Sequence, residues 1–337
     1  MNRILVVNVN WLGDVVFSSA VFGNLRQAFP QARIACMAPP RVRAALEHIE
    51  GIDEIYEFDE DGAQKSLLGK LKFVFKLREG RFDAAFFLHR SATRALLAKL
   101  AGIKTRVGYF TKKRGKLLTQ SLEPVDLESR HRADVYLGVL EGYGIAVKSR
   151  HSRLKLSEEE LKAARALLAA GGVRGPFIVL NPGGNWDLKR WPPERFARLA
   201  EQLFAATGKQ VVLTGAQKDE NLCVDIAAEC SQSTPAVLAG KTDLATAFAV
   251  LALADVVVSN DSGPLHVASS LGTRVVAVFG PTRPEITGPR GSGKSRTLHR
   301  EVGCNSKPCY YGACPDNICM KAVTVKDVVD AVKELGR

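Results

Sequence analysis

Residues 256–266 read VVVSNDSGPLH, and this stretch decides the fold class of the chain. Its first four residues are typical of a buried β-strand, and its Gly-Pro pair opens a segment of helical period that runs through Leu271. Asp261 or Ser262 can cap such a helix, and Pro264 occupies the first turn, where a missing N–H costs nothing. Free backbone N–H groups at this helix end predict a phosphate site, with pyrophosphate as its natural ligand.

The same order of strand, loop and helix recurs on both sides of this stretch and predicts parallel sheets built from βαβ units. Candidate strands cover residues 4–9, 33–37, 54–58, 84–88 and 106–108 in the first half, and 177–180, 210–214, 236–238, 256–259 and 274–279 in the second. Candidate helices cover residues 193–206, 218–230, 244–253 and 324–335. The predicted fold class is α/β, with two Rossmann-like doubly wound domains that bind ligands beyond the carboxyl ends of their strands.

A chain of 337 residues exceeds what one hydrophobic core usually organises, which favours two domains. We expect an N-terminal domain over residues 1–155 and a linker region over residues 156–175, which contain the Gly171-Gly172 pair. A C-terminal domain then covers residues 176–337, and its final helix is a candidate to pack back on the N-terminal domain.

The composition excludes several classes of protein. Hydrophobic residues make up 46% of the chain and charged residues 24%, which is typical of a globular protein and not of a disordered or fibrous one. No run reaches the roughly 18 apolar residues of a transmembrane helix, and the first residues are too polar for a signal peptide. We therefore expect a cytoplasmic protein whose seven cysteines stay reduced.

The net charge of +12 predicts an anionic partner, which could be nucleic acid, a membrane surface or a phosphorylated small molecule. Residues 1–170 hold 28 Lys and Arg against 19 Asp and Glu, a net charge of +9, so the remainder carries only +3. Residues 81–116 contain ten basic side chains and one acidic side chain, Asp83. This run is either a solvated loop or a surface for a phosphate-rich ligand.

Asp14 is the candidate general base. It follows the first strand in the loop Asn10-Trp11-Leu12-Gly13-Asp14 and lies near the start of the next helix. The positive end of the helix dipole favours its ionised form, which can accept a proton. The alternative is that Asp14 only caps its helix.

Two loops of the second half carry further polar candidates. The loop over residues 181–192 contains Lys189 and Arg190, and Lys189 is placed to stabilise a departing phosphate unless the loop is merely a solvated basic surface. His266 either faces the ligand at the helix start or packs in the core. The loop over residues 214–220 holds carboxylates that can bind ribose hydroxyls.

Two other motifs are set aside. Residues 288–295 match the G-x-x-x-x-G-K-[ST] pattern, but no strand precedes them and no helix follows, so we expect a basic surface loop and not a P-loop. Cys304, Cys309, Cys314 and Cys319 recur at a spacing unlike that of structural zinc sites, which favours reduced thiols over a metal site. No divalent-metal site is expected.

Taken together, these motifs resemble the ADP-heptose:lipopolysaccharide heptosyltransferases, glycosyltransferase family 9, over nearly the whole chain. The resemblance is strongest to the members that add the second heptose. It is carried by the segments at 11–14, 181–183, 189–192, 260–266 and 279–282 and by the cysteine-rich end at Cys319-Met320.

The resemblance implies a GT-B fold, in which two domains face each other across a cleft. The N-terminal half would bind the acceptor and the C-terminal half ADP-heptose, with inversion at the anomeric carbon, no cofactor and no essential metal. It also implies that Asp14 is the general base and that Lys189 meets the donor phosphates. The implied donor-binding residues are Gly184, Asn185, Lys189, Glu220 (or Asp219), Thr242, Leu244, Asp261, Ser262, Gly263, Pro264 and His266.

The implied acceptor is a lipid A–Kdo inner-core glycolipid, and its negative charges would explain the excess of positive charge in the first half of the chain. The candidate acceptor contacts are Gly13, Arg90, Arg94, Lys112, Lys113 and Arg114. A cytoplasmic protein with this charge would also contact the inner leaflet of the inner membrane at its surface.

Three alternatives stay open at this point. The first is transfer to another core position, as in heptosyltransferase I or III, and the second is a sugar-nucleotide epimerase of GT-B shape. The third is a nucleic-acid-binding protein, which we do not expect because the basic run offers only Tyr109 and Phe110 for base stacking.

Overall fold

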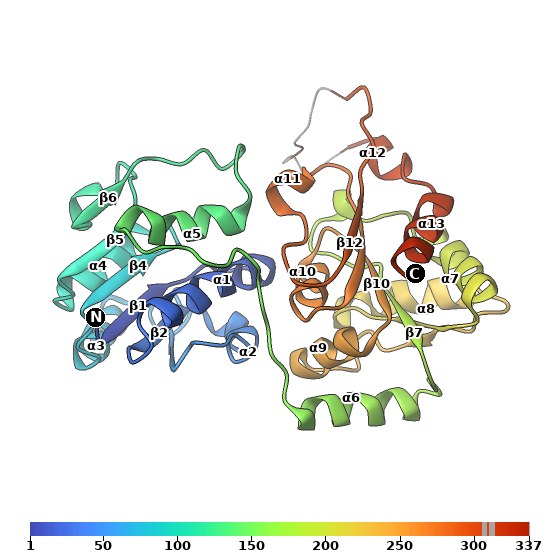
Figure 1. Cartoon of the computed structure of the whole chain (residues 1–337), viewed down its shortest axis with the longest axis horizontal. Coiled ribbons are helices and arrows are strands. Elements are labelled where there is room, and N and C mark those ends of the chain that lie inside the picture. Colours follow the sequence, from blue (N-terminus) through green and yellow to red (C-terminus); the bar gives the residue numbers. More distant parts are fainter. Residues whose placement is uncertain (305–308, 310–313, 337) are drawn as a thin grey trace. The chain divides into compact units, whose positions relative to one another are not determined.

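The computed structural model describes residues 1–304, 309 and 314–336. The chain divides into two units, Met1–Lys155 and Leu156–Arg337, and each contains a six-stranded parallel sheet (Figure 1). The predicted α/β class is therefore confirmed. Among the described residues, the structure contains no helix with the length and apolar character needed to span a bilayer.

In the first unit the strand order is β3-β2-β1-β4-β5-β6. The strands are β1 Arg3–Val7, β2 Arg33–Ala38, β3 Glu54–Glu57, β4 Ala84–Phe87, β5 Thr105–Tyr109 and β6 Gln120–Leu122. The helices are α1 Leu12–Ala28, α2 Arg43–Leu46, α3 Leu67–Glu79, α4 Ala92–Leu100 and α5 Arg132–Tyr143, with 3-10 turns at Pro40–Val42 and Gly115–Leu117. Helix α1 packs against α5, and α3 packs against α4. The chain order reverses beside β1, and this brings Asp14 to a switch point of the sheet, where α/β proteins bind ligands.

In the second unit the strand order is β12-β11-β10-β7-β8-β9. The strands are β7 Phe177–Asn181, β8 Gln210–Leu213, β9 Ala236–Val237, β10 Val256–Asn260, β11 Arg274–Val278 and β12 Ser295–Leu298. The helices are α6 Glu158–Ala170, α7 Pro193–Thr207, α8 Glu220–Ala228, α9 Leu244–Leu253, α10 Gly263–Ser270, α11 Pro284–Thr287, α12 Ile318–Lys321 and α13 Val325–Leu335, with 3-10 turns at Asp187–Lys189 and Gln217–Asp219. Strand β10 pairs with β7 and β11, so the stretch that decided the fold class is the centre of its sheet.

The central strands are continuous apolar runs because helices cover both faces of the sheet. Residues 256–260 are buried throughout, as are residues 4–7 in β1. The two edge strands β6 and β12 were not foreseen. Each is short and polar, with the sequences QSL and SRTL, and only its pairing with a neighbouring strand defines it.

Two other elements differ from expectation. Most of the expected linker is helix α6, which begins with a capping box between Ser157 and Glu160 and packs against α9 in the second unit. Helix α13, the candidate to pack back on the first unit, lies against α7, and its buried Val328 and Val332 belong to the core of the second unit.

The P-loop-like residues 288–295 lead into β12, after the short helix α11. A P-loop needs a strand before it and a helix after it, and this segment has the reverse order. The rejection of that motif is confirmed.

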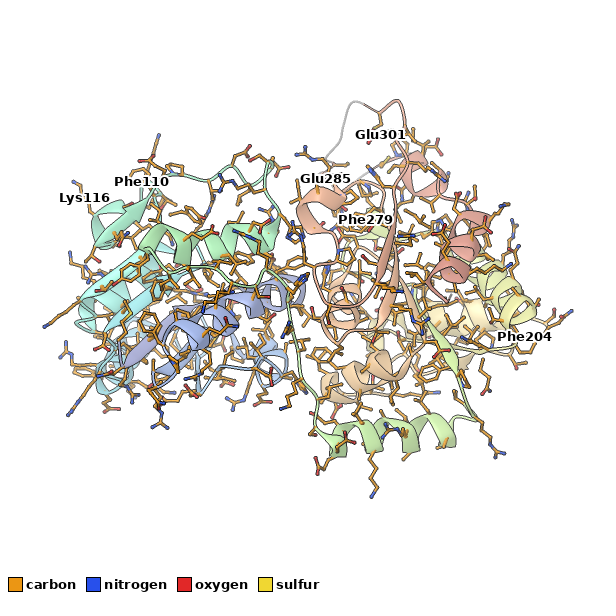
Figure 2. The ribbon with its side chains drawn as sticks, in the orientation of Figure 1. Phe110, Lys116, Phe204, Phe279, Glu285 and Glu301 are labelled. Carbon is orange, nitrogen blue, oxygen red and sulfur yellow. The ribbon has the colours of Figure 1, made fainter. Side chains whose placement is uncertain are left out.

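We predict that Phe196→Ala in α7 destabilises the second unit by about 3–5 kcal/mol, because the ring is fully buried against Trp191 and its loss leaves a cavity. Phe204→Ala on the same helix removes a half-exposed ring, labelled in Figure 2, and is expected to cost clearly less. Urea unfolding followed by the fluorescence of Trp186 and Trp191 measures both. Equal destabilisation by the two variants would contradict this account of the core.

Candidate functional site

The candidate donor site begins where β10 ends and α10 starts. Ser262 is the residue before the helix, with extended φ and ψ of −149° and 168°, and Pro264 lies in the first turn. The Ser262 hydroxyl does not cap the helix and instead lies 3.1 Å from the hydroxyl of Ser259. The helix start at Gly263 therefore lacks a side-chain cap, which leaves its positive end suited to an anion.

Asn260, the last residue of β10, fixes the neighbouring loop. Its Oδ1 accepts the backbone N–H of Trp191 at 3.0 Å, and its Nδ2 donates to the carbonyl of Pro182 at 2.8 Å. Both ends of the 181–192 loop are thereby tied to the strand that precedes α10. Sequence reasoning did not assign this role, because an asparagine at a strand end reads as an ordinary turn residue.

Four side chains contact the buried carboxylate of Asp261. Its Oδ2 pairs with Lys189 Nζ at 2.6 Å and accepts the hydroxyls of Thr282 at 2.7 Å and Thr287 at 3.2 Å. Its Oδ1 lies 3.5 Å from His266 Nε2. The structure thus brings the predicted residues Lys189, Asp261 and His266 together beside the start of α10.

The charge of this cluster is set by its partners. Burial alone would raise the pKa of Asp261, but the hydrogen bond from His266 and the positive charge of Lys189 outweigh it and hold the pKa well below its usual range. Asp261 is therefore an anion at every pH of interest, and it keeps the Lys189 ammonium at the helix start.

Gly184 and Asn185 lie beside further cations. Arg190 donates from Nη2 to the Gly184 carbonyl at 2.6 Å, and Lys218 donates to Asn185 Oδ1 at 2.7 Å. The preceding Gly183 is needed for close approach, because a Cβ there would lie 2.6 Å from the Asp219 carboxylate. The loop after β7 and the loop after β8 are thereby joined.

The two candidate ribose carboxylates have different surroundings. Asp219 is buried, accepts the backbone N–H of Ala216 at 3.1 Å and lies 3.7 Å from Arg190. Glu220 is the first residue of α8, is half-exposed and accepts a hydrogen bond from Gln217. Asp219 therefore stabilises its own loop, whereas Glu220 is the carboxylate that a ligand can reach more easily.

Thr242 and Leu244, two of the donor-binding residues implied by the resemblance, flank the start of α9. Both are half-buried, and the residue between them, Asp243, caps the helix by accepting the N–H of Thr246 at 2.8 Å. Both lie beyond the carboxyl end of β9, on the side of the sheet where α/β proteins bind ligands.

In the first unit, Asp14 lies in the first turn of α1 and Gly13 directly precedes it. The Asp14 carboxylate does not cap the helix. Its Oδ1 accepts the hydroxyl of Tyr136, from α5, at 2.6 Å. Burial, together with the neighbouring charge of Asp14, raises the pKa of Tyr136 well above its usual value, so the phenol stays a hydrogen-bond donor.

Sequence reasoning missed Tyr136. It stands 122 positions from Asp14, in an apolar helical run where a tyrosine reads as a core residue. The positive charges that act on this tyrosine are those of Arg132 and Arg90. Of the predicted acceptor contacts, Arg90 is exposed and near the Asp14–Tyr136 pair, and Lys112 and Lys113 are exposed.

The structure corrects the expectation for Arg94 and Arg114. Arg94 is 1% exposed, pairs with Glu60 at 2.7 Å and donates to the Asn8 carbonyl at 3.1 Å. Arg114 is fully buried, and its guanidinium donates to the carbonyls of Tyr109 and His89. Burial, with Arg90 nearby, lowers the pKa of Arg114 to about 10. Both side chains hold loops of the first unit and do not present charge at its surface.

The cysteine prediction lies partly outside the described residues, because 305–308 and 310–313 separate Cys304, Cys309 and Cys314. Within residues 1–304, 309 and 314–336, no three His, Cys, Asp or Glu side chains gather as a metal site would require. Cys319 is buried, and Cys314 is exposed.

Comparisons with known proteins place this geometry in a family. The profile of Glycosyltransferase family 9 (heptosyltransferase) matches residues 70–314. The chain is 31% identical over 313 residues to the lipopolysaccharide heptosyltransferase 2 of Escherichia coli strain K12, a match that covers 89% of each protein.

Solved structures agree. The structure of E. coli ADP-heptose lps heptosyltransferase II superimposes with a TM-score of 0.82 and 28% identity, covering 99% of this chain and 98% of that one. The glycosyl transferase family 9 protein from Veillonella parvula gives 0.86 and 25% identity, covering 99% and 97%. The chain therefore belongs to glycosyltransferase family 9, the heptosyltransferases, and is a glycosyltransferase.

Proposed function

We propose that this protein transfers L-glycero-D-manno-heptose from ADP-heptose to the inner core of lipopolysaccharide, adding the second heptose to the first. The observation that carries the proposal is the Lys189–Asp261–His266 cluster at the start of α10, in a chain of this family. The start of α10 and the N–H donors of Lys189 suit a diphosphate, which a sugar-nucleotide donor must place at a fixed point, and Asp261 positions Lys189 there.

On the donor side, the start of α10 and the Lys189 ammonium face the diphosphate. As the bond between the anomeric carbon and the diphosphate oxygen breaks, negative charge develops on the departing ADP, and a cation fixed beforehand stabilises it. Asp261 holds Lys189 in place, and Thr282 and Thr287 hold Asp261. We propose that this positive charge serves the departure of ADP without a divalent metal ion.

For the nucleoside, we propose Glu220 as the ribose carboxylate, since Asp219 is buried and already bonded to its own loop. Thr242 and Leu244 would flank the adenine at the start of α9, and Gly184 and Asn185 would line the donor loop. Gly263, Pro264 and Ser262 form the helix start that receives the phosphates.

On the acceptor side, Asp14 is the proposed general base. The acceptor hydroxyl oxygen forms the new bond to the anomeric carbon, its proton passes to the Asp14 carboxylate, and ADP leaves with the electron pair of the broken bond. Attack opposite the leaving group inverts the anomeric centre. Because Tyr136 occupies Oδ1, Oδ2 remains for the substrate proton.

The acceptor we propose is a lipid A–Kdo glycolipid bearing the first heptose. Its phosphates and carboxylates would meet the exposed cations Arg90, Lys112 and Lys113 of the first unit. The half-buried Arg132 is an addition from the structure. Such an acceptor is anchored in a bilayer, so we also propose that the protein acts in the cytoplasm at the surface of the inner membrane.

We predict that Asp14→Asn lowers kcat by about 10²- to 10⁴-fold while ADP binding changes little, because the variant loses a proton acceptor and keeps its shape. Transfer assays and calorimetry with ADP measure the two effects. Asp134→Asn, which removes a surface carboxylate paired with Arg150, should retain full activity. Loss of ADP affinity in parallel with activity would contradict the role of Asp14 as base.

We predict that Tyr136→Phe lowers kcat by about tenfold and leaves the KM for both substrates unchanged, because the Asp14 carboxylate loses the hydrogen bond that holds it in place for proton transfer. Tyr109→Phe is the matched control. It removes a buried tyrosine hydroxyl that donates to the Val135 carbonyl at 2.9 Å and does not contact Asp14. If both variants keep the kcat of the wild type, or if both lower it equally, Tyr136 is a packing residue only.

We predict that Lys189→Gln lowers kcat by about 10²- to 10³-fold, as expected for removal of a group that stabilises transition-state charge. Lys209→Gln is the control, since Lys209 pairs with Asp255 at the same 2.6 Å elsewhere in the second unit. The measurement is the initial rate at saturating donor. A kcat equal to that of the wild type would show that Lys189 does not assist the departure of ADP.

A further inference from the structure

Exposed large hydrophobic side chains gather on two neighbouring helices of the first unit. Among the described residues, ten large hydrophobic side chains are exposed, and α3 and α4 hold six of them. These six define what we call the α3–α4 face: Leu67, Leu68, Leu71, Phe75, Leu96 and Leu100. Leu67 is 75% exposed and Phe75 is 58% exposed, so neither contributes to the core.

The exposed residues of α3 share one side of the helix. Because successive residues turn by about 100°, positions 67, 68, 71 and 75 fall within an arc of about 100°. The adjoining side of α3 carries Phe73, Val74 and Leu77, which are buried in the core of the first unit. Helix α3 therefore has an apolar surface wider than the core needs, and the fold covers only part of it.

Helix α4 extends this exposed face. Leu96 and Leu100 are one helical turn apart and both are exposed. The two helices pack against each other, and Arg78 at the end of α3 donates to the Leu100 carbonyl at 2.9 Å. The α3–α4 face is thus a surface of two packed helices and not a set of scattered side chains.

Cations surround this face. Residues 65–79 contain five Lys and Arg and one acidic side chain, Glu79. Lys65, Lys72, Lys76 and Arg78 are exposed, as is Lys99 on α4. The Arg78 guanidinium lies over the Phe75 ring at 5.6 Å, which places charge directly beside the exposed aromatic side chain.

We propose that the α3–α4 face docks on an anionic phospholipid surface. Leucine and phenylalanine side chains can enter the boundary between headgroups and acyl chains, while lysine and arginine remain among the phosphates, as in interfacial amphipathic helices. A second copy of the chain fits less well, because a two-fold interface through this face would bring the two sets of cations together. The anionic headgroups supply the complementary charge.

The α3–α4 face is then the part of the protein that makes the membrane contact of the proposed function. Its role in heptose transfer rests on that proposed function. The binding itself can be measured without an acceptor or a donor. Transfer to a water-soluble, deacylated acceptor should not need the face, whereas transfer to an acceptor embedded in vesicles should.

The test is sedimentation of the full-length protein with vesicles of phosphatidylethanolamine and phosphatidylglycerol, with phosphatidylcholine vesicles for comparison. The wild type should bind the anionic vesicles and bind the neutral ones at least tenfold more weakly. The double variant Leu71→Ser/Phe75→Ser should lower the affinity for anionic vesicles at least tenfold. Lys72→Gln/Lys76→Gln should lower it similarly and weaken its dependence on salt. Val224→Ser, which changes an exposed aliphatic residue of α8, is the matched control and should bind as the wild type does.

Thermal unfolding and ADP binding of each variant establish that it is folded. Unchanged vesicle binding by both double variants would overturn the proposal. A second result would also overturn it. If light scattering shows that the wild type is a dimer and the Leu71→Ser/Phe75→Ser variant a monomer, and if vesicle binding is the same for both, the face is a self-association surface. If no heptose transfer occurs but vesicle binding depends on these residues, the proposed function fails and the docking face stands.

Discussion

The candidate donor site of the second unit depends on one ion pair, between Lys189 and the buried carboxylate of Asp261. Burying a carboxylate is unfavourable unless charges and hydrogen bonds compensate for the loss of water. The Asp261 carboxylate pairs with a lysine, contacts a histidine and accepts hydrogen bonds from two threonine hydroxyls. These partners come from the segments that follow β7 and β11, the second of which includes α11, and from α10. The carboxylate therefore sets the relative positions of the groups that face the donor phosphates, and Asn260 beside it fixes the 181–192 loop.

The two units use the same local design for different chemistry. In each, an aspartate follows a central parallel strand and lies near the start of a helix, at Asp14 in α1 and at Asp261 before α10. Asp14 is bonded by a neutral phenol that leaves one carboxylate oxygen for a proton. Asp261 pairs with the Lys189 ammonium and contacts His266, and these partners hold its pKa well below its usual range, so it is a poor base at neutral pH. The partners of each carboxylate, and not its place after a strand, decide its function.

The fold and the donor loops could be predicted because the signals are local. Three valines, a polar turn and a Gly-Pro pair within residues 256–266 define a strand, a loop and a helix start without reference to distant residues. Tyr136 could not be found in this way, since its role exists only through packing of α5 on α1. The basic run misled for the same reason. A count of charges does not reveal that Arg114 is buried and donates to the carbonyls of Tyr109 and His89. Nor does it reveal that Arg94 is paired with Glu60. The exposure of the α3 leucines is also decided by packing, because the core covers only part of the apolar surface of this helix.

The central claim is that Lys189 and the start of α10 receive the donor diphosphate while Asp261 holds the site together. A crystal structure of the complex with ADP tests it most directly. The account predicts that the terminal phosphate lies within hydrogen-bond distance of Lys189 Nζ and the first backbone N–H groups of α10, with Asp261 still bonded to Thr282 and His266. A diphosphate bound elsewhere, with Lys189 paired only to Asp261, would contradict it.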